Sequence, residues 1–72
     1  MRYFLLVYDR SKGVLLSEEE FESEDRALDE RFEVEKRIPD DVEVVVLGAE
    51  SREALQKTHS RYFTPLRDLL AG

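Results

Sequence analysis

The sequence predicts one small α+β domain in the order β-β-α-β-α, with a three-stranded mixed sheet in the strand order 2-1-3 and both helices on one face. Three observations lead to this prediction. The chain has 72 residues, enough for a single domain over residues 1–72 with no linker. Residues 3–8 and 44–47 are unbroken apolar runs, which are typical of strands covered on both sides. Two further segments carry apolar residues at helical spacing.

Residues 3–8 form the most hydrophobic run of the chain, so we expect the central strand there. The polar residues 9–13 follow, in which Gly13 suits a turn that needs a positive φ. Residues 14–16 are apolar and predict a second strand, so that residues 3–17 form a β-hairpin. Residues 17–23 carry four glutamates and are expected to be a polar connection, anchored in the core by Phe21.

The first helix is predicted over residues 24–38. Ser23 is a suitable N-cap, and Glu24 and Asp25 lie in the first turn, where the helix dipole favours negative charge. Pro39 disfavours a helical conformation in the residue before it and therefore ends the helix. The side chains expected to face the core are Ala27, Leu28, Phe32, Val34 and Ile38, whereas Glu30 and Glu33 are expected to be exposed.

Residues 42–47 predict the third strand, and the second helix is predicted to begin after Ser51 as its N-cap. A right-handed crossover through the first helix would set the third strand parallel to one of the first two strands. The stripe expected on the second helix continues through Leu66, Leu69 and Leu70, and it begins with Ala54, Leu55, Thr58, His59, Tyr62 and Phe63.

The composition excludes several classes of protein. The chain has no cysteine, so it forms neither disulfides nor thiolate metal sites. None of its three glycines belongs to a glycine-rich phosphate loop. No apolar stretch approaches the roughly 18 residues of a membrane span, and the short N-terminal run is a poor signal peptide. We therefore expect a cytoplasmic protein that binds no membrane, no cofactor and no metal ion.

Negative charge is concentrated in the middle of the chain. The formal net charge is −6, and residues 17–43 contain 13 acidic and 4 basic residues, a local net of −9. Such a chain is poorly suited to neutralising phosphates, so we expect no binding to nucleic acid. The acidic middle is either a solvated surface or a surface that attracts a basic protein partner.

Candidate functional residues cluster in the last predicted helix. His59 is the only side chain that titrates near neutral pH, and it is either a partly buried structural residue or a base or pH switch. Arg61 and Tyr62 either bind an anion or carboxylate, or serve as a solvated and a core residue. Asp9 and Glu50 follow strands, as metal ligands do in ribonuclease H-type nucleases, but the chain is too short for that fold. We predict no catalytic residue and no enzymatic activity.

With both helices on one face, the other face of the sheet would leave one apolar set of strand side chains in water, and soluble monomers rarely expose such a patch. Two copies packed sheet on sheet would cover it, and edge pairing of the third strands is the alternative. The chain is therefore expected to be a homodimer. The residues of the expected interaction or ligand surface are Tyr3, Leu5, Val7, Val44, Val46, His59, Arg61 and Tyr62.

Two resemblances bear on function. Residues 1–10, 44–55 and 58–63 (Thr-His-Ser-Arg-Tyr-Phe) resemble small actinobacterial proteins of unknown function, which implies a bacterial protein but no activity. Residues 2–7 and 51–55 are similar to the partial ribonuclease H-like domain of HicB-type antitoxins. The chain departs from that domain by having a helix in place of its third meander strand and by lacking its Pro-Asp-Leu-Pro-Gly segment.

Together these features predict a small acidic protein-interaction module without catalytic chemistry, which works as a homodimer. The alternative is an antitoxin-like or inhibitor-like regulatory protein that binds a basic surface of its partner.

Overall fold

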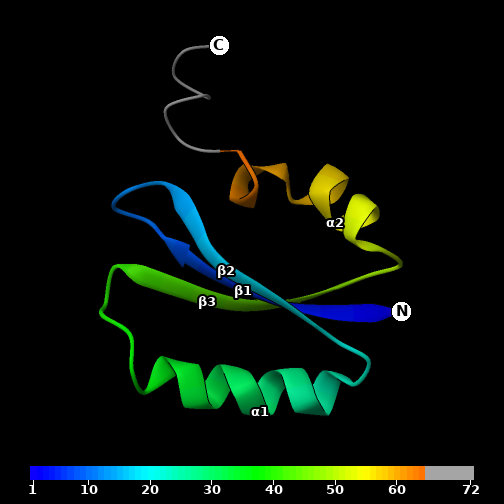
Figure 1. Ribbon diagram of the computed structural model, residues 1–72, viewed down its shortest axis with the longest axis horizontal. Helices are drawn as coiled ribbons and strands as arrows, with labels where there is room; N and C mark the ends of the chain where they lie inside the picture. The colour runs from blue at the N-terminus through cyan, green and yellow to red at the C-terminus, as the bar shows by residue number, and fades with distance from the viewer. Residues whose placement is uncertain (65–72) are drawn as a thin grey trace.

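The computed structural model describes residues 1–64, and it has the predicted element order (Figure 1). The expectation for Leu66, Leu69 and Leu70 lies outside these residues. The elements are β1 (Arg2–Asp9), β2 (Val14–Phe21), α1 (Glu24–Glu35), β3 (Val42–Ala49), α2 (Arg52–Thr58) and a short 3-10 helix, η1 (Ser60–Tyr62).

The sheet has the predicted strand order, β2-β1-β3, but it is antiparallel rather than mixed. The connection through α1 brings β3 back in the same direction as β2, as a crossover predicts. However, β1 lies between these two strands and runs against both of them. The parallel strands therefore never pair, and every neighbouring pair in the sheet is antiparallel.

The turn between β1 and β2 is formed by Gly13 and by hydrogen bonds to the Asp9 side chain. Gly13 has a φ of 67°, a conformation that costs glycine little. The Asp9 carboxylate accepts hydrogen bonds from the Ser11 hydroxyl at 2.6 Å and from the Lys12 amide at 3.0 Å. The Ser11 hydroxyl and the Lys12 amide lower the pKa of Asp9. The turn is thus held by a charged acceptor at the end of β1.

The second strand is longer than predicted, because the glutamate-rich residues 17–21 pair with β1 instead of forming a loop. The register changes between Val7, which faces Ser17, and Tyr8, which faces Leu15, so Leu16 is the extra residue of a β-bulge. An edge strand tolerates such polar residues, because half of its side chains and its outer backbone face water.

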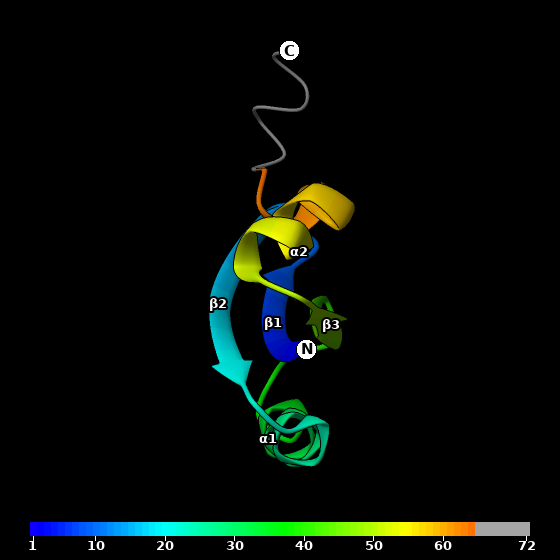
Figure 2. The ribbon, with the colours of Figure 1, turned by 90° about the vertical axis from the view of Figure 1, so that its right-hand side faces the viewer.

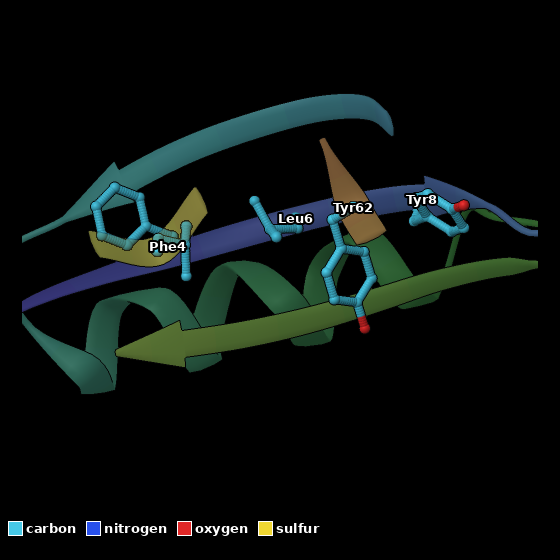
Figure 3. Packing of buried hydrophobic residues seen from close by; sticks show 5 residues of the cluster. Phe4, Leu6, Tyr8 and Tyr62 are labelled. Atoms are coloured by element: carbon cyan, nitrogen blue, oxygen red, sulfur yellow. The ribbon is translucent and has the colours of Figure 1, made fainter. Parts of the chain in front are cut away.

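The two helices cover opposite faces of the sheet (Figure 2), so the prediction that both lie on one face is wrong. Alternate side chains of β1 enter two separate cores. Toward α2 and η1, the buried cluster consists of Phe4, Leu6, Tyr8, Leu55 and Tyr62 (Figure 3). Toward α1, it consists of Leu5, Val7 and Val44, with Val34 and Ile38 packed against them. A central strand that is apolar on both sides needs a cover on each side, and each helix supplies one.

The first helix begins after Ser23, whose hydroxyl accepts a hydrogen bond from the Arg26 amide, as predicted, but it ends at Glu35 rather than at residue 38. It also buries a different face from the one predicted: Ala27 is fully buried, whereas Leu28 and Phe32 are 42% and 65% exposed. At about 100° per residue, Leu28 and Phe32 lie about 100° and 140° around the helix from Ala27. The face toward the sheet is therefore a narrow stripe that contains Ala27 and Val34, and Ile38 packs against the same core from beyond the end of the helix. Glu33 is exposed as predicted, whereas Glu30 is half-buried and not exposed as predicted.

The second helix begins after its predicted N-cap, Ser51, whose hydroxyl accepts a hydrogen bond from the Ala54 amide at 3.1 Å. It is shorter than predicted, because His59 has φ −128° and ψ 46° and interrupts the helix before η1. Leu55 anchors α2 in the core, and Arg52 ties it to β2 through a hydrogen bond of 2.9 Å from Nη2 to Oε1 of Glu18.

Candidate functional site

The apolar sheet residues predicted to form an interaction surface are mostly inside the protein. Leu5, Val7 and Val44 are buried in the core beneath α1, and Val46 packs against that core. Tyr3 is half-buried and pairs with Gly48 across β1 and β3. The expected open apolar face therefore does not exist, and the sheet-on-sheet packing based on it loses its physical reason.

The other three predicted residues, His59, Arg61 and Tyr62, do lie together, on the opposite side of the sheet. They line a cavity of about 360 Å³ with Thr58 and Ser60. This cavity lies at the junction between α2 and η1, and Leu47 of β3 contributes to its wall. The sequence thus placed these residues in one neighbourhood, although an interrupted helix rather than a continuous one brings them there.

A compact polar network surrounds Tyr62. Its hydroxyl donates a hydrogen bond of 2.8 Å to Oε2 of Glu43, on β3. Nη2 of Arg61 donates to the same hydroxyl at 3.0 Å and lies 3.3 Å from Oε1 of Glu43. The Arg61 guanidinium also lies 4.5 Å from the centre of the Tyr62 ring, and that ring meets Tyr8 edge to face at 5.2 Å.

The electrostatics of this network favour a structural role. Burial raises the pKa of Tyr62, so its phenol is protonated at neutral pH and can donate to Glu43. The hydrogen bond with Tyr62 raises the pKa of Arg61, which stays cationic. The acid, the phenol and the guanidinium therefore satisfy one another, and the network fastens η1 to β3.

The outer edge of β3 pairs with no other strand among residues 1–64. The Arg10 amide donates to the Asp41 carbonyl at 3.0 Å, so the backbone groups of Asp41 point toward β1. Alternate residues of an antiparallel strand direct their backbone groups to opposite sides. Every second residue of β3, counted from Val42, therefore directs its amide and carbonyl groups away from β1. They are Val42, Val44, Val46 and Gly48, and the Val42 amide is already bonded to the Pro39 carbonyl at 3.1 Å.

The two edges of the sheet differ in how they are protected. The outer strand β2 has a bulge at Leu16 and three consecutive glutamates, residues 18–20. Two of these glutamates are ion-paired, Glu20 with Arg2 at 3.1 Å and Glu18 with Arg52. Such features discourage another strand from pairing there. By contrast, β3 pairs with β1 in an unbroken register and contains one charged residue, Glu43, and no proline.

The exposed apolar side chains of α1 lie on the same side of the molecule as the β3 edge. Figure 2 shows α1 beneath β1 and β3. One flank of the helix faces β2 across a groove of about 440 Å³ that includes Phe21 and Glu30. Leu28 and Phe32 occupy the other flank, with Arg31 and Glu35. We call the outer edge of β3 together with Leu28 and Phe32 the edge surface.

Sequence reasoning missed the edge surface because it assigned Leu28 and Phe32 to the core. A signal was present, since Ala27, Val34 and Ile38 are spaced by seven and four residues and by themselves form one stripe. The two larger side chains fall outside that stripe. Glu43 was also not identified as the partner of Tyr62, because nothing in the local sequence relates two residues 19 positions apart.

No protein-family model, curated protein or solved structure matches this chain. Neither helix within residues 1–64 has the length and apolar character that crossing a membrane requires. In the same residues, no group of three or more histidine, cysteine, aspartate or glutamate side chains is arranged so that it could hold a metal ion.

Proposed function

We propose that this chain is a small, acidic, cytoplasmic protein-interaction module without catalytic chemistry, and that it works as a homodimer. The observation that carries the proposal is the edge surface. An exposed, regular and mostly apolar edge strand readily pairs with another chain unless charge, proline or a bulge opposes it. Here these protective features are concentrated on β2, and β3 has a single glutamate.

The exposed residues of α1 support the same proposal. Phe32 is the largest exposed apolar side chain among the described residues, with 65% of it exposed. Leu28, one helical turn before it, is 42% exposed. Folding of the monomer gains little from either side chain at that exposure. A partner that pairs with β3 would approach from their side and bury them, so both features of the edge surface are explained by one contact.

Exchanging one surface leucine or phenylalanine for glutamate tests the proposal. Phe32→Glu changes the edge surface, and Leu16→Glu is its matched control, because Leu16 is 54% exposed on the protected edge strand. We expect the wild-type chain and the control to show, by light scattering after size exclusion at about 100 µM, a mass approaching twice 8.5 kDa. Removal of a central interface aromatic costs about 2 kcal/mol or more, so Phe32→Glu should weaken association more than tenfold.

A wild-type chain that remains monomeric at this concentration would contradict the proposal. So would a Phe32→Glu variant that associates as well as the Leu16→Glu variant does. Circular dichroism of both variants should match the wild type, since both positions are exposed and neither substitution removes a core side chain.

The second candidate is a regulatory protein that binds a basic partner, and one observation favours it. The groove between β2 and α1 is lined by three acidic side chains, by one basic side chain and by a phenylalanine: Asp29, Glu30, Glu33, Arg26 and Phe21. A cationic side chain would find both an apolar wall and negative charge there. The two candidates respond oppositely to salt, because screening weakens the repulsion between two acidic copies and also weakens the attraction of an acidic chain to a basic partner.

A further inference from the structure

The geometry points to one particular dimer: two copies of β3 pair antiparallel about a two-fold axis at Val45, which joins the two sheets into one of six strands. This inference rests on the proposed self-association, and it names the partner as a second copy and fixes how the copies meet. A two-fold axis perpendicular to the sheet would place both α1 helices on one face and both α2 helices on the other.

The register follows from the backbone groups that point away from β1. These belong to Val42, Val44, Val46 and Gly48. In an antiparallel pair, the residue numbers of two facing residues always add up to the same sum. A sum of 90 gives all four positions a partner in both copies, and Val42 takes part through its carbonyl because its amide is bonded to Pro39. Val44 then faces Val46 of the second copy, Val42 faces its Gly48, and the two Val45 residues face each other. A shift by two residues in either direction leaves at least one of these positions without a partner.

The position of α1 agrees with this register. Strands in a sheet lie about 4.8 Å apart. The helix lies beneath β1 and β3 (Figure 2), so it would be about one strand spacing from the axis. The two α1 helices would then be about 10 Å apart, which is the usual distance between packed helices.

The exposed side chains of α1 also come to the axis in this register. The end of α1 lies near the start of β3 (Figure 1). From Val42 to Val45 the strand advances about 10 Å, which corresponds to six or seven helical residues counted back from the end of α1. That position falls at Leu28 or Asp29, about one helical turn before Phe32. The pairing that satisfies the strand thus also brings together the apolar side chains of the two helices.

The size of this contact sets its expected strength. A strand of eight residues is about 26 Å long and a helix is about 10 Å thick. The contact surface formed by β3 and α1 together is therefore on the order of 400 Å² in each copy. Interfaces of this size are weak. We therefore expect association in the micromolar range. Because the β2 edge is bulged and charged, residues 1–64 of each chain offer one open edge, and the assembly closes as a dimer instead of growing into a filament.

A single introduced cysteine tests the register, since the chain has none of its own. In this dimer the two Val45 residues form a non-hydrogen-bonded pair, whose Cα atoms lie about 4.5 Å apart, within the range of a disulfide. Val45→Cys should therefore form a covalent dimer under mild oxidation. Leu47→Cys is the matched control, on the same strand and the same face. Leu47 would face Glu43 of the second copy, which leaves the two introduced sulfurs roughly 13 Å apart.

We expect nearly complete disulfide dimer for Val45→Cys and little for Leu47→Cys on a non-reducing gel. The mass of the wild type and of both reduced variants is measured in parallel. If they are dimers and Val45→Cys fails to cross-link, or Leu47→Cys cross-links better, the register is wrong while the proposed homodimer stands. If the wild-type chain is a monomer, the register and the proposed function both fail.

Discussion

At the scale of single residues, Glu43 shows how the fold accommodates a charge near the start of the apolar edge strand β3. Its side chain is 24% exposed, so its carboxylate is partly removed from water. The Tyr62 hydroxyl and the Arg61 guanidinium replace the lost water as hydrogen-bond donors. The same carboxylate therefore fixes the position of η1 on β3, and the network contributes to stability only while all its members are present.

Replacing Tyr62 by phenylalanine should lower the free energy of unfolding by about 0.5–1.5 kcal/mol, because the hydroxyl gives up its hydrogen bonds with Glu43 and Arg61. Urea unfolding at pH 7 measures this change, with Tyr3→Phe on the other face as the control. A Tyr62→Phe variant as stable as the wild type would show that the network contributes nothing.

The pH dependence of Tyr62→Phe provides a second readout. The pKa of Tyr62 is raised in the folded protein, mainly by burial, so folding favours the protonated phenol. The contribution of the Tyr62 phenol to the stability of the folded state is fully present below the ordinary tyrosine pKa of 10.0. It is lost as the pH rises through the pKa that Tyr62 has in the folded protein. The wild type should therefore lose more stability above pH 10 than the Tyr62→Phe variant does. Equal losses would contradict the assignment.

At the scale of elements, the features that could be predicted from the sequence are those set by neighbouring residues. Ser23 and Ser51 cap their helices as expected, and Gly13 adopts the positive φ that its turn requires. Each of these depends on a few adjacent residues and their backbone. The order of the elements was predictable for the same reason, since the apolar runs and the breaks between them are local signals.

The features that could not be predicted depend on how the elements pack. The apolar positions on α1 are compatible with either of two faces, and packing against the sheet selects the face that carries the small residues Ala27 and Val34. The extension of β2 depends on the backbone of β1 and not on its own glutamates. The placement of the helices required knowing that residues 3–8 are buried on both faces by two different helices, which the pattern of one strand cannot specify.

At the scale of the whole molecule, charge separates the two functional candidates. Two copies that each carry a net charge of −6 repel one another, and salt screens this repulsion. Raising the salt concentration from about 0.05 to about 0.5 M should therefore tighten the homodimer, as measured by sedimentation. A complex with a basic peptide such as oligolysine would weaken over the same range. Self-association that weakens with salt would indicate that ion pairs, and not the strand edge and the apolar residues of α1, hold the copies together.

Hydrogen exchange at the edge of β3 tests the homodimer most directly. The amides of Val44 and Val46 point away from β1, whereas those of Val45 and Leu47 point toward it and serve as internal controls. We expect the Val44 and Val46 amides to be protected at high protein concentration, and to lose this protection on dilution while the controls keep theirs. Rapid exchange at Val44 and Val46 at every concentration would contradict pairing through β3. Protection that survives in the monomer would contradict it too, because a segment of the same chain would then cover the edge.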